Sequence, residues 1–236
     1  MAAPAALGLC LIAAGRHAAP SSRRVFRVIV VGKAAAGFAA GAQARPRSDE
    51  LRLVDDRDYA NRFWRVLLAT HDVLTRFRSG FLGKASPVHF FWGSFDLAVT
   101  RFSGRRAPVH PGGVPHLSDD VTREAYSHEV SSAGFWPGGG GPVNDAAFYS
   151  YAYPAPDGFA SAIIRPDGAF FSKELGEFIL PYEAMRAAPD PVRALMDFLQ
   201  STYEAAADLG RWDRSSLDCP PGEVGRPRLV VQTSII

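Results

Sequence analysis

The sequence predicts an α+β fold, a mostly antiparallel β-sheet with two long helices packed on one face. Two segments, residues 55–79 and 190–209, carry apolar residues at helical spacing. Between them lie short β-prone runs separated by glycine- and proline-containing turns. The 236 residues are 47% hydrophobic and 21% charged, as in an ordinary globular protein. We therefore expect one domain of about 150–200 residues with tails.

The two ends of the chain differ from its centre in composition. Residues 1–48 hold seven of the 26 basic residues and no acidic one, so the rest holds 19 basic and 24 acidic residues, a net charge of −5. We expect a poorly ordered basic Ala/Gly-rich leader over residues 1–50, the domain over 51–217 and a tail over 218–236. The leader's Gly32-Lys33 does not have the spacing of a phosphate-binding loop.

The cell compartment is inferred from the first residues and from cysteine usage. The apolar start, residues 1–14, has no positive charge before it, unlike a signal peptide, and is too short to span a bilayer. Only Cys10 and Cys219 are present, so no disulfide framework is expected. These features favour a cytoplasmic protein without a membrane partner, and few aromatic residues in the leader argue against nucleic acid.

The helices have clear start and stop signals. The first, residues 55–79, has aspartates at its start and is followed by Gly80, and the second has Asp190 as its cap and Gly210 after its end. One or two further helical turns are expected over 181–187. Six strands are expected, at residues 88–92, 95–102, 123–131, 147–153, 159–164 and 176–180. The first two form a hairpin around Gly93-Ser94, and residues 105–120 form a loop.

Polar residues in the hairpin mark the candidate site. The hairpin has apolar residues on both faces, so His89, Asp96 and Arg101 each need a partner if buried. His128, on the next strand, is the fourth member of the catalytic set that we predict. Three interpretations stay open: a metal set of His89, His128 and a carboxylate, His128 as a general base, or a buried network that fixes strand register. We assign no metal ligand, and the cofactor is unknown.

A glycine-rich segment and an aromatic row provide further candidate contacts. We predict that Trp136, Gly138, Gly139, Gly140 and Glu124 bind the ligand, with the glycines as an anion-binding nest, a lid or a surface connection. Residues 147–153 place three tyrosines on one strand face, which suits either stacking of a ligand or packing. Glu177 is a further polar residue on a predicted strand.

Two functions follow from these features. One is an enzymatic or small-ligand-binding domain with a His/Asp/Arg site beside the glycine-rich loop, with a small molecule as its partner. The alternative is a non-catalytic interaction module that uses the tyrosine-rich face or an exposed sheet edge, through which it self-associates.

The chain resembles an uncharacterised bacterial family, domain-of-unknown-function family five-nine-nine-six. The resemblance runs from Asp55 to Leu217, and its residues include RFWRVL, GKASPVHFFWGSFDLAVTRFSGRRAP, EAYSHEVSSAGFWPGGGG, ELGEFILPYEAMRAAPDP and FLQSTYEAAADLGRWDR. It implies no particular activity. It also implies that a strand-rich N-terminal half is missing here, which we expect to reflect truncation or a wrong reading frame upstream.

Overall fold

The structure, a computed structural model, describes residues 57–92, 94–114, 117–139 and 145–219, together with 222, 225 and 226. The expected leader and most of the expected tail lie outside these residues. The described part contains a six-stranded antiparallel sheet in the order β1-β2-β3-β4-β6-β5. Its strands are β1 (His89–Phe91), β2 (Asp96–Arg106), β3 (His128–Trp136), β4 (Ala147–Tyr153), β5 (Phe170–Ser172) and β6 (Glu177–Pro181). Its helices are α1 (Arg57–Ser79), α2 (Asp119–Ala125), α3 (Tyr182–Arg186), α4 (Pro191–Leu209) and α5 (Arg214–Leu217).

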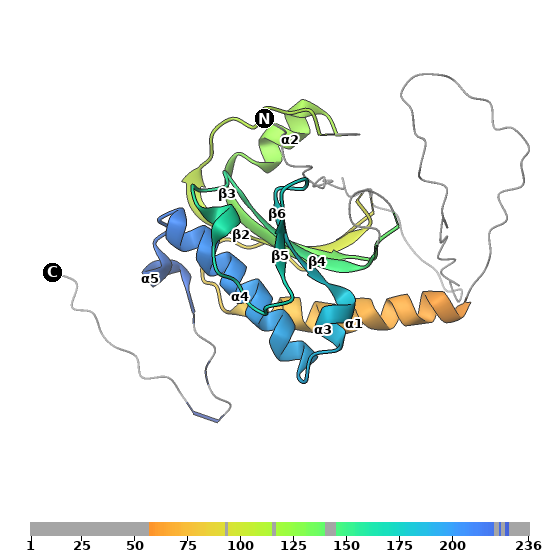
Figure 1. The fold of residues 1–236 in the computed structure, drawn as a ribbon. Helices are drawn as coiled ribbons and strands as arrows, with labels where there is room; N and C mark the ends of the chain where they lie inside the picture. The colour runs from red at the N-terminus through yellow and green to blue at the C-terminus, as the bar shows by residue number, and fades with distance from the viewer. Residues whose placement is uncertain are drawn as a thin grey trace, which may run out of the picture.

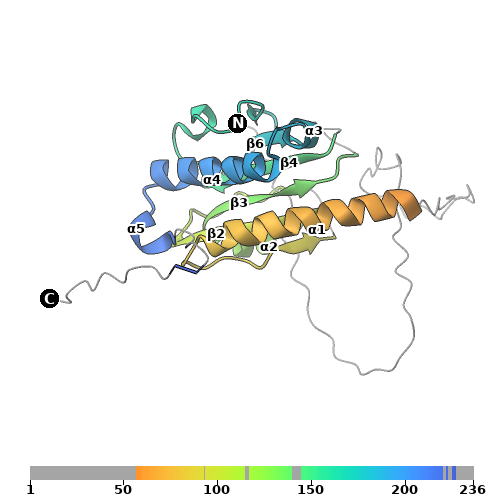
Figure 2. The same cartoon turned by 90° about the horizontal axis from the view of Figure 1, so that it is seen from below.

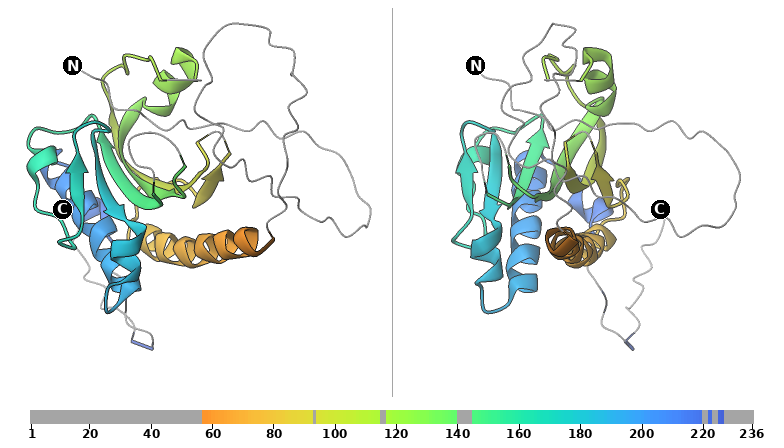
Figure 3. Two further views of the ribbon diagram at one scale, coloured as in Figure 1. Left: turned by 45° about the vertical axis from the view of Figure 1, so that its right-hand side comes forward. Right: turned by 90° about the vertical axis from the view of Figure 1, so that its right-hand side faces the viewer.

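The two long helices, α1 and α4, lie side by side on one face of the sheet (Figures 1 and 2). The main hydrophobic core fills the space between them and this face, which we call the helix face. It includes Leu74 of α1, Val99 of β2, Phe148 of β4 and Phe198 of α4. Helix α2 lies on the opposite side of the sheet (Figures 1 and 3). The predicted α+β class and the placement of both long helices are confirmed.

Local sequence explains where the long helices begin and end. The Asp190 side chain accepts a hydrogen bond from the Arg193 backbone N–H at 2.9 Å, and Pro191 occupies the first turn of α4. Gly210 follows its last residue. In α1 the fully buried residues lie in the C-terminal half, whereas the N-terminal half packs on the core through the partly buried Phe63, Val66 and Leu67. The ring of Phe63 stacks on Phe95 at 5.7 Å.

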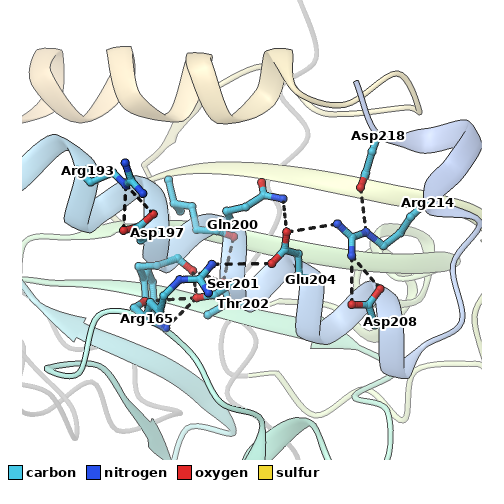
Figure 4. A network of polar contacts seen from close by, with 12 residues as sticks. Arg165, Arg193, Asp197, Gln200, Ser201, Thr202, Glu204, Asp208, Arg214 and Asp218 are labelled. Atoms are coloured by element: carbon cyan, nitrogen blue, oxygen red, sulfur yellow. Dashed lines mark hydrogen bonds and ion pairs between the residues drawn. The ribbon is translucent and has the colours of Figure 1, made fainter. Parts of the chain in front are cut away.

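Charged side chains tie α5 to α4 (Figure 4). The Arg214 guanidinium reaches Asp218 and Asp208 at 2.9 Å each and Glu204 at 3.3 Å. Single partly exposed ion pairs stabilise little, but one guanidinium shared by three carboxylates fixes the short helix in place. We infer that this ion-pair network has a structural role.

Two of the six predicted strands are corrected by the structure. The first three residues of the segment 123–131 belong to α2, because Ser118 caps that helix and two aspartates occupy its first turn. The strand β3 starts at His128 and continues to Trp136. In the segment 159–164, Phe159–Ser161 form a 3-10 turn after Gly158, whose φ of 82° is left-handed, and the remaining residues form no strand.

The edge strand β5 was not predicted. Only three residues long, it pairs with β6 from Phe170 to Ser172. The apolar run 159–164 is a stronger sequence signal, but Ile163 is 97% exposed and no strand of the described sheet pairs with this run. Pairing with a neighbouring strand, rather than local β-propensity, therefore determined which of the two segments forms a strand.

Candidate functional site

The residues predicted to form one polar site lie on different faces of the sheet. Asp96 and Arg101 are five residues apart on β2, so their side chains point to opposite faces. Arg101 shares its face with Leu97 and Val99, in the main core. Asp96 shares its face with Ala98, which packs with Tyr149 in a separate cluster. The sheet therefore separates Asp96 from Arg101.

Arg101 is enclosed by aromatic rings in the core. It is 1% exposed, and its guanidinium carbon lies 3.5 Å from the ring centre of Phe77 and 4.3 Å from that of Tyr203. Its Nη2 donates to the Phe77 carbonyl at the end of α1, whereas Nε and Nη1 have no hydrogen-bond partner among the described residues. Burial lowers the pKa of Arg101 to about 10, so it stays charged at neutral pH. It anchors α1 to the sheet.

The two predicted catalytic histidines do not join Asp96. His89 is exposed on the edge strand β1. His128 lies at the first residue of β3, whereas Leu97 pairs with Phe135 near the end of that strand. The seven residues from His128 to Phe135 span roughly 23 Å at 3.3 Å per residue, so His128 and Asp96 lie at opposite ends of the strand pair. The expected meeting of His89, Asp96, Arg101 and His128 in one pocket is thus corrected by the geometry.

The predicted ligand-binding residues are also dispersed. Glu124 is exposed on α2, and Trp136 packs at the end of β3 against the cluster that contains Ala98 and Tyr149. Gly138 and Gly139 follow β3 with positive φ angles, and Gly140 lies outside the described residues.

The face of the sheet opposite α1 and α4 carries buried polar groups. We call it the tyrosine face; in register order it comprises Asp96, Ala98 and Thr100 of β2, Ser132 and Gly134 of β3, Tyr149, Tyr151 and Tyr153 of β4, and Glu177 and Ile179 of β6. The Tyr149 hydroxyl crosses β3 and donates to the Asp96 carboxylate, which also accepts from Ser94. A Cβ on Gly134 would lie 2.5 Å from that hydroxyl. Glycine is therefore required there for the tyrosine to reach Asp96.

A cavity of about 250 Å³ lies beside the tyrosine face. Its walls include His110, Tyr126, Tyr151, Tyr153, Phe171 and Glu177. Glu177 is 2% exposed, and its carboxyl group makes no hydrogen bond to any other residue that the structure describes. The Tyr126 and Tyr151 hydroxyls are 3.0 Å apart and hydrogen-bonded, which closes one wall.

His110 comes from the loop before α2 and packs on two of these tyrosines. Its ring centre lies 4.9 Å from those of Tyr126 and Tyr153. Its Nδ1 accepts a hydrogen bond from the Gly112 N–H at 3.0 Å, so the neutral ring carries its proton on Nε2. Burial lowers the pKa of His110, opposed by Asp119, and the ring is therefore neutral at pH 7.

Burial sets the protonation of the carboxyl groups in this site. Removal from water, with a smaller contribution from the nearby Asp96, raises the pKa of Glu177 from 4.5 to about 8. Burial also raises the pKa of Asp96, although hydrogen bonds from Ser94 and Tyr149 oppose the change. Burial raises the pKa of Tyr151 to about 12. At pH 7 the cavity therefore holds a protonated carboxylic acid and neutral tyrosines.

This arrangement can exchange a proton near neutral pH and can bind a small molecule through aromatic faces. A carboxyl group with a pKa near 8 is suited to general acid–base work. Within the described segments, no group of three or more His, Cys, Asp or Glu side chains has the geometry of a metal site.

Sequence reasoning noted Glu177 but did not place it in the site, and it missed Tyr126 and His110 as site residues. The available signal for Glu177 was a single acid in the apolar run Glu177–Pro181, two residues from Ile179 on the same face. Tyr126 and His110 come from segments that were predicted as strand and loop, and nothing in their local sequence indicates which face they cover.

Comparison with known proteins agrees with the resemblance seen in the sequence. No curated protein matches the chain, and no solved structure matches it either. In the parts of the chain that are described, no helix has the length and apolar character needed to cross a bilayer. The profile of a family of unknown function, DUF5996, matches residues 44–219 of the 236. This match covers well over half of the chain, which therefore belongs to the DUF5996 family.

Proposed function

We propose that this protein binds a small molecule in the cavity beside the tyrosine face, with Glu177 as the group that hydrogen-bonds it and exchanges a proton with it. One observation carries the proposal: Glu177 is 2% exposed, its side chain lines the cavity, and its carboxyl group has no hydrogen-bond partner among the described residues.

The energetic argument concerns the cost of burying a carboxyl group. Polar groups buried without a hydrogen bond cost roughly 1–3 kcal/mol in proteins, and nearly all native ones are satisfied. The unpartnered Glu177 oxygens are not completely enclosed, and a ligand with a polar group there would recover part of that cost. The aromatic walls supply apolar contact area, and few but well-placed polar groups are typical of ligand pockets.

The same geometry suits a catalytic version of this function. A protonated Glu177 can donate a proton to a bound substrate and recover it from solvent at neutral pH. The hydrogen-bonded pair Tyr126 and Tyr151 lies on the same wall and can orient a substrate hydroxyl or carbonyl group.

A matched pair of variants tests the location of the site. Ala155 lines the cavity and is exposed, whereas the nearby Ala160 is exposed and does not line it. We expect fragments found by ligand-observed NMR with the wild-type protein to bind Ala160→Trp equally and to lose binding to Ala155→Trp. Glu177→Gln, which keeps the side-chain volume, is expected to weaken the binding of these fragments at least threefold. Equal binding to both tryptophan variants, or no fragment bound at all, would refute the proposed site.

A second candidate function is self-association through β1, the edge strand of the described sheet. Trp92, which follows β1, is 70% exposed, and among the described strands β1 pairs with β2 alone. The tyrosine-rich face does not support this version of the function, because Tyr149 is buried. Sedimentation velocity of the wild-type protein and Trp92→Ser tests it: a dimer lost in the variant supports it, and a wild-type monomer at every concentration rules it out.

The expected cytoplasmic location and bacterial origin remain part of this proposal. The low cysteine content, Cys10 and Cys219 in 236 residues, fits a reducing compartment.

A further inference from the structure

The cavity beside the tyrosine face combines acidic groups with aromatic walls. Besides Glu177, its lining includes Glu174, and Asp96 lies close enough on the same face to raise the pKa of Glu177. Neither Glu177 nor Asp96 forms an ion pair with a basic side chain among the described residues. Among the described residues of the lining, Lys173 is the one lysine or arginine, and it is exposed.

The aromatic residues supply the second half of the argument. Tyr126, Tyr151 and Tyr153 line the cavity together with the ring of Phe171. The negative face of an aromatic ring attracts a cation, and desolvated sites of this kind bind organic ammonium groups. The raised pKa values of these tyrosines keep them neutral, so their hydroxyls do not compete as anions.

Resting on the function proposed above, we propose that the ligand is a small organic ammonium cation, whose charge lies against Glu177 and the ring faces of Tyr126, Tyr151 and Tyr153. The cavity of about 250 Å³ lies below the usual range for drug-sized ligands, which fits a cation of a few carbon atoms. An ammonium group is the partner that satisfies a buried carboxylate and aromatic faces together.

Binding of a cation has a protonation consequence. At pH 7 the unliganded Glu177 is protonated, and an adjacent positive charge favours its ionised form, so binding releases a proton. The groups that face it from the packed elements are Asp96, Tyr149, Tyr151, Tyr126, His110, Lys173 and Glu174. The tyrosines and the histidine are neutral at this pH. Affinity for the cation therefore rises with pH up to about pH 8.

The test compares charged probes with a neutral probe of the same shape. Isothermal titration with choline, tetramethylammonium and methylammonium is compared with dimethylbutanol, the isostere of choline in which carbon replaces nitrogen. We expect at least one cation to bind the full-length protein about tenfold more tightly than dimethylbutanol. Titrations in buffers of different ionisation enthalpy are expected to show release of up to one proton at pH 7.

Two variants separate this inference from the function on which it rests. Glu177→Gln is expected to lose about tenfold in affinity for the cation while its affinity for dimethylbutanol is unchanged. Ala155→Trp is expected to abolish binding of both the cation and dimethylbutanol. If neutral fragments bind and are blocked by Ala155→Trp while no ammonium probe binds, the cation inference fails and the proposed function stands. If nothing binds at the cavity, both fail.

Discussion

Replacing Glu177 by glutamine is expected to remove a pH-dependent loss of stability. The pKa of Glu177 is raised from 4.5 to about 8 in the folded protein, so between these values the folded state holds a proton that the unfolded state has released. Stability from this group is therefore fully present below about pH 4.5 and falls as the pH rises to about 8. The pKa difference multiplied by 1.36 kcal/mol per pH unit gives a total loss of about 5 kcal/mol.

The prediction follows from the isosteric character of the change. Glutamine matches the protonated carboxyl group in size and stays neutral, so at about pH 5 the two proteins should differ by less than ~1.5 kcal/mol. Above about pH 8 the variant should be more stable by several kcal/mol, because it has no charge to bury. Between those limits the difference should grow by roughly 1.4 kcal/mol per pH unit.

Urea denaturation followed by circular dichroism, repeated at intervals between about pH 5 and pH 9, measures this difference. Glu174→Gln is the control, because Glu174 also lines the cavity but is exposed, and its curve should follow that of the wild-type protein. If the wild-type and Glu177→Gln stabilities run parallel over this range, Glu177 is ionised in the folded protein without a penalty. The argument from its burial is then wrong.

Substitutions at three further positions, each with its expected effect on stability, test the packing that forms the site and the core. Gly134→Ala places a Cβ 2.5 Å from the Tyr149 hydroxyl and is expected to lower the unfolding free energy by about 1–3 kcal/mol in the same urea assay. Gly168→Ala is the control, because the nearest atom to its Cβ would be at 3.4 Å, and it should change the unfolding free energy little. Arg101→Met fills the aromatic cage without a charge and should lower the unfolding free energy by less than ~1.5 kcal/mol, while Arg101→Ala should lower it by about 3–5 kcal/mol. Equal losses of stability in thermal denaturation would contradict this view of the cage. Asp190→Ala removes the cap of α4 and should lower stability by about 1 kcal/mol, and an unchanged melting temperature would show that the cap is dispensable.

Several elements could be predicted from local sequence because their signals are local. The cap at Asp190 and the apolar spacing define α4, and the alternation in Ala147–Tyr153 defines β4 with its three tyrosines on one face. The short strand β5 and the start of β3 could not be predicted, because they depend on pairing partners distant in sequence.

The candidate site shows the same division. Side-chain alternation on β2 already places Asp96 and Arg101 on opposite faces, so their separation was readable from the sequence. The sequence does not show which face α1 and α4 cover, and hence that Arg101 is in the core. Nor does it show that His110 and Tyr126 close over Glu177.

By itself, the sequence determined the α+β class, both long helices and the polar residues that an otherwise apolar sheet has to accommodate. The tertiary structure decided that Glu177, rather than the histidines of the strands, lies at a cavity with a raised pKa. The physical reason is that a pKa and a cavity arise from desolvation by every segment packed around a group, and those segments come from four separate parts of the chain.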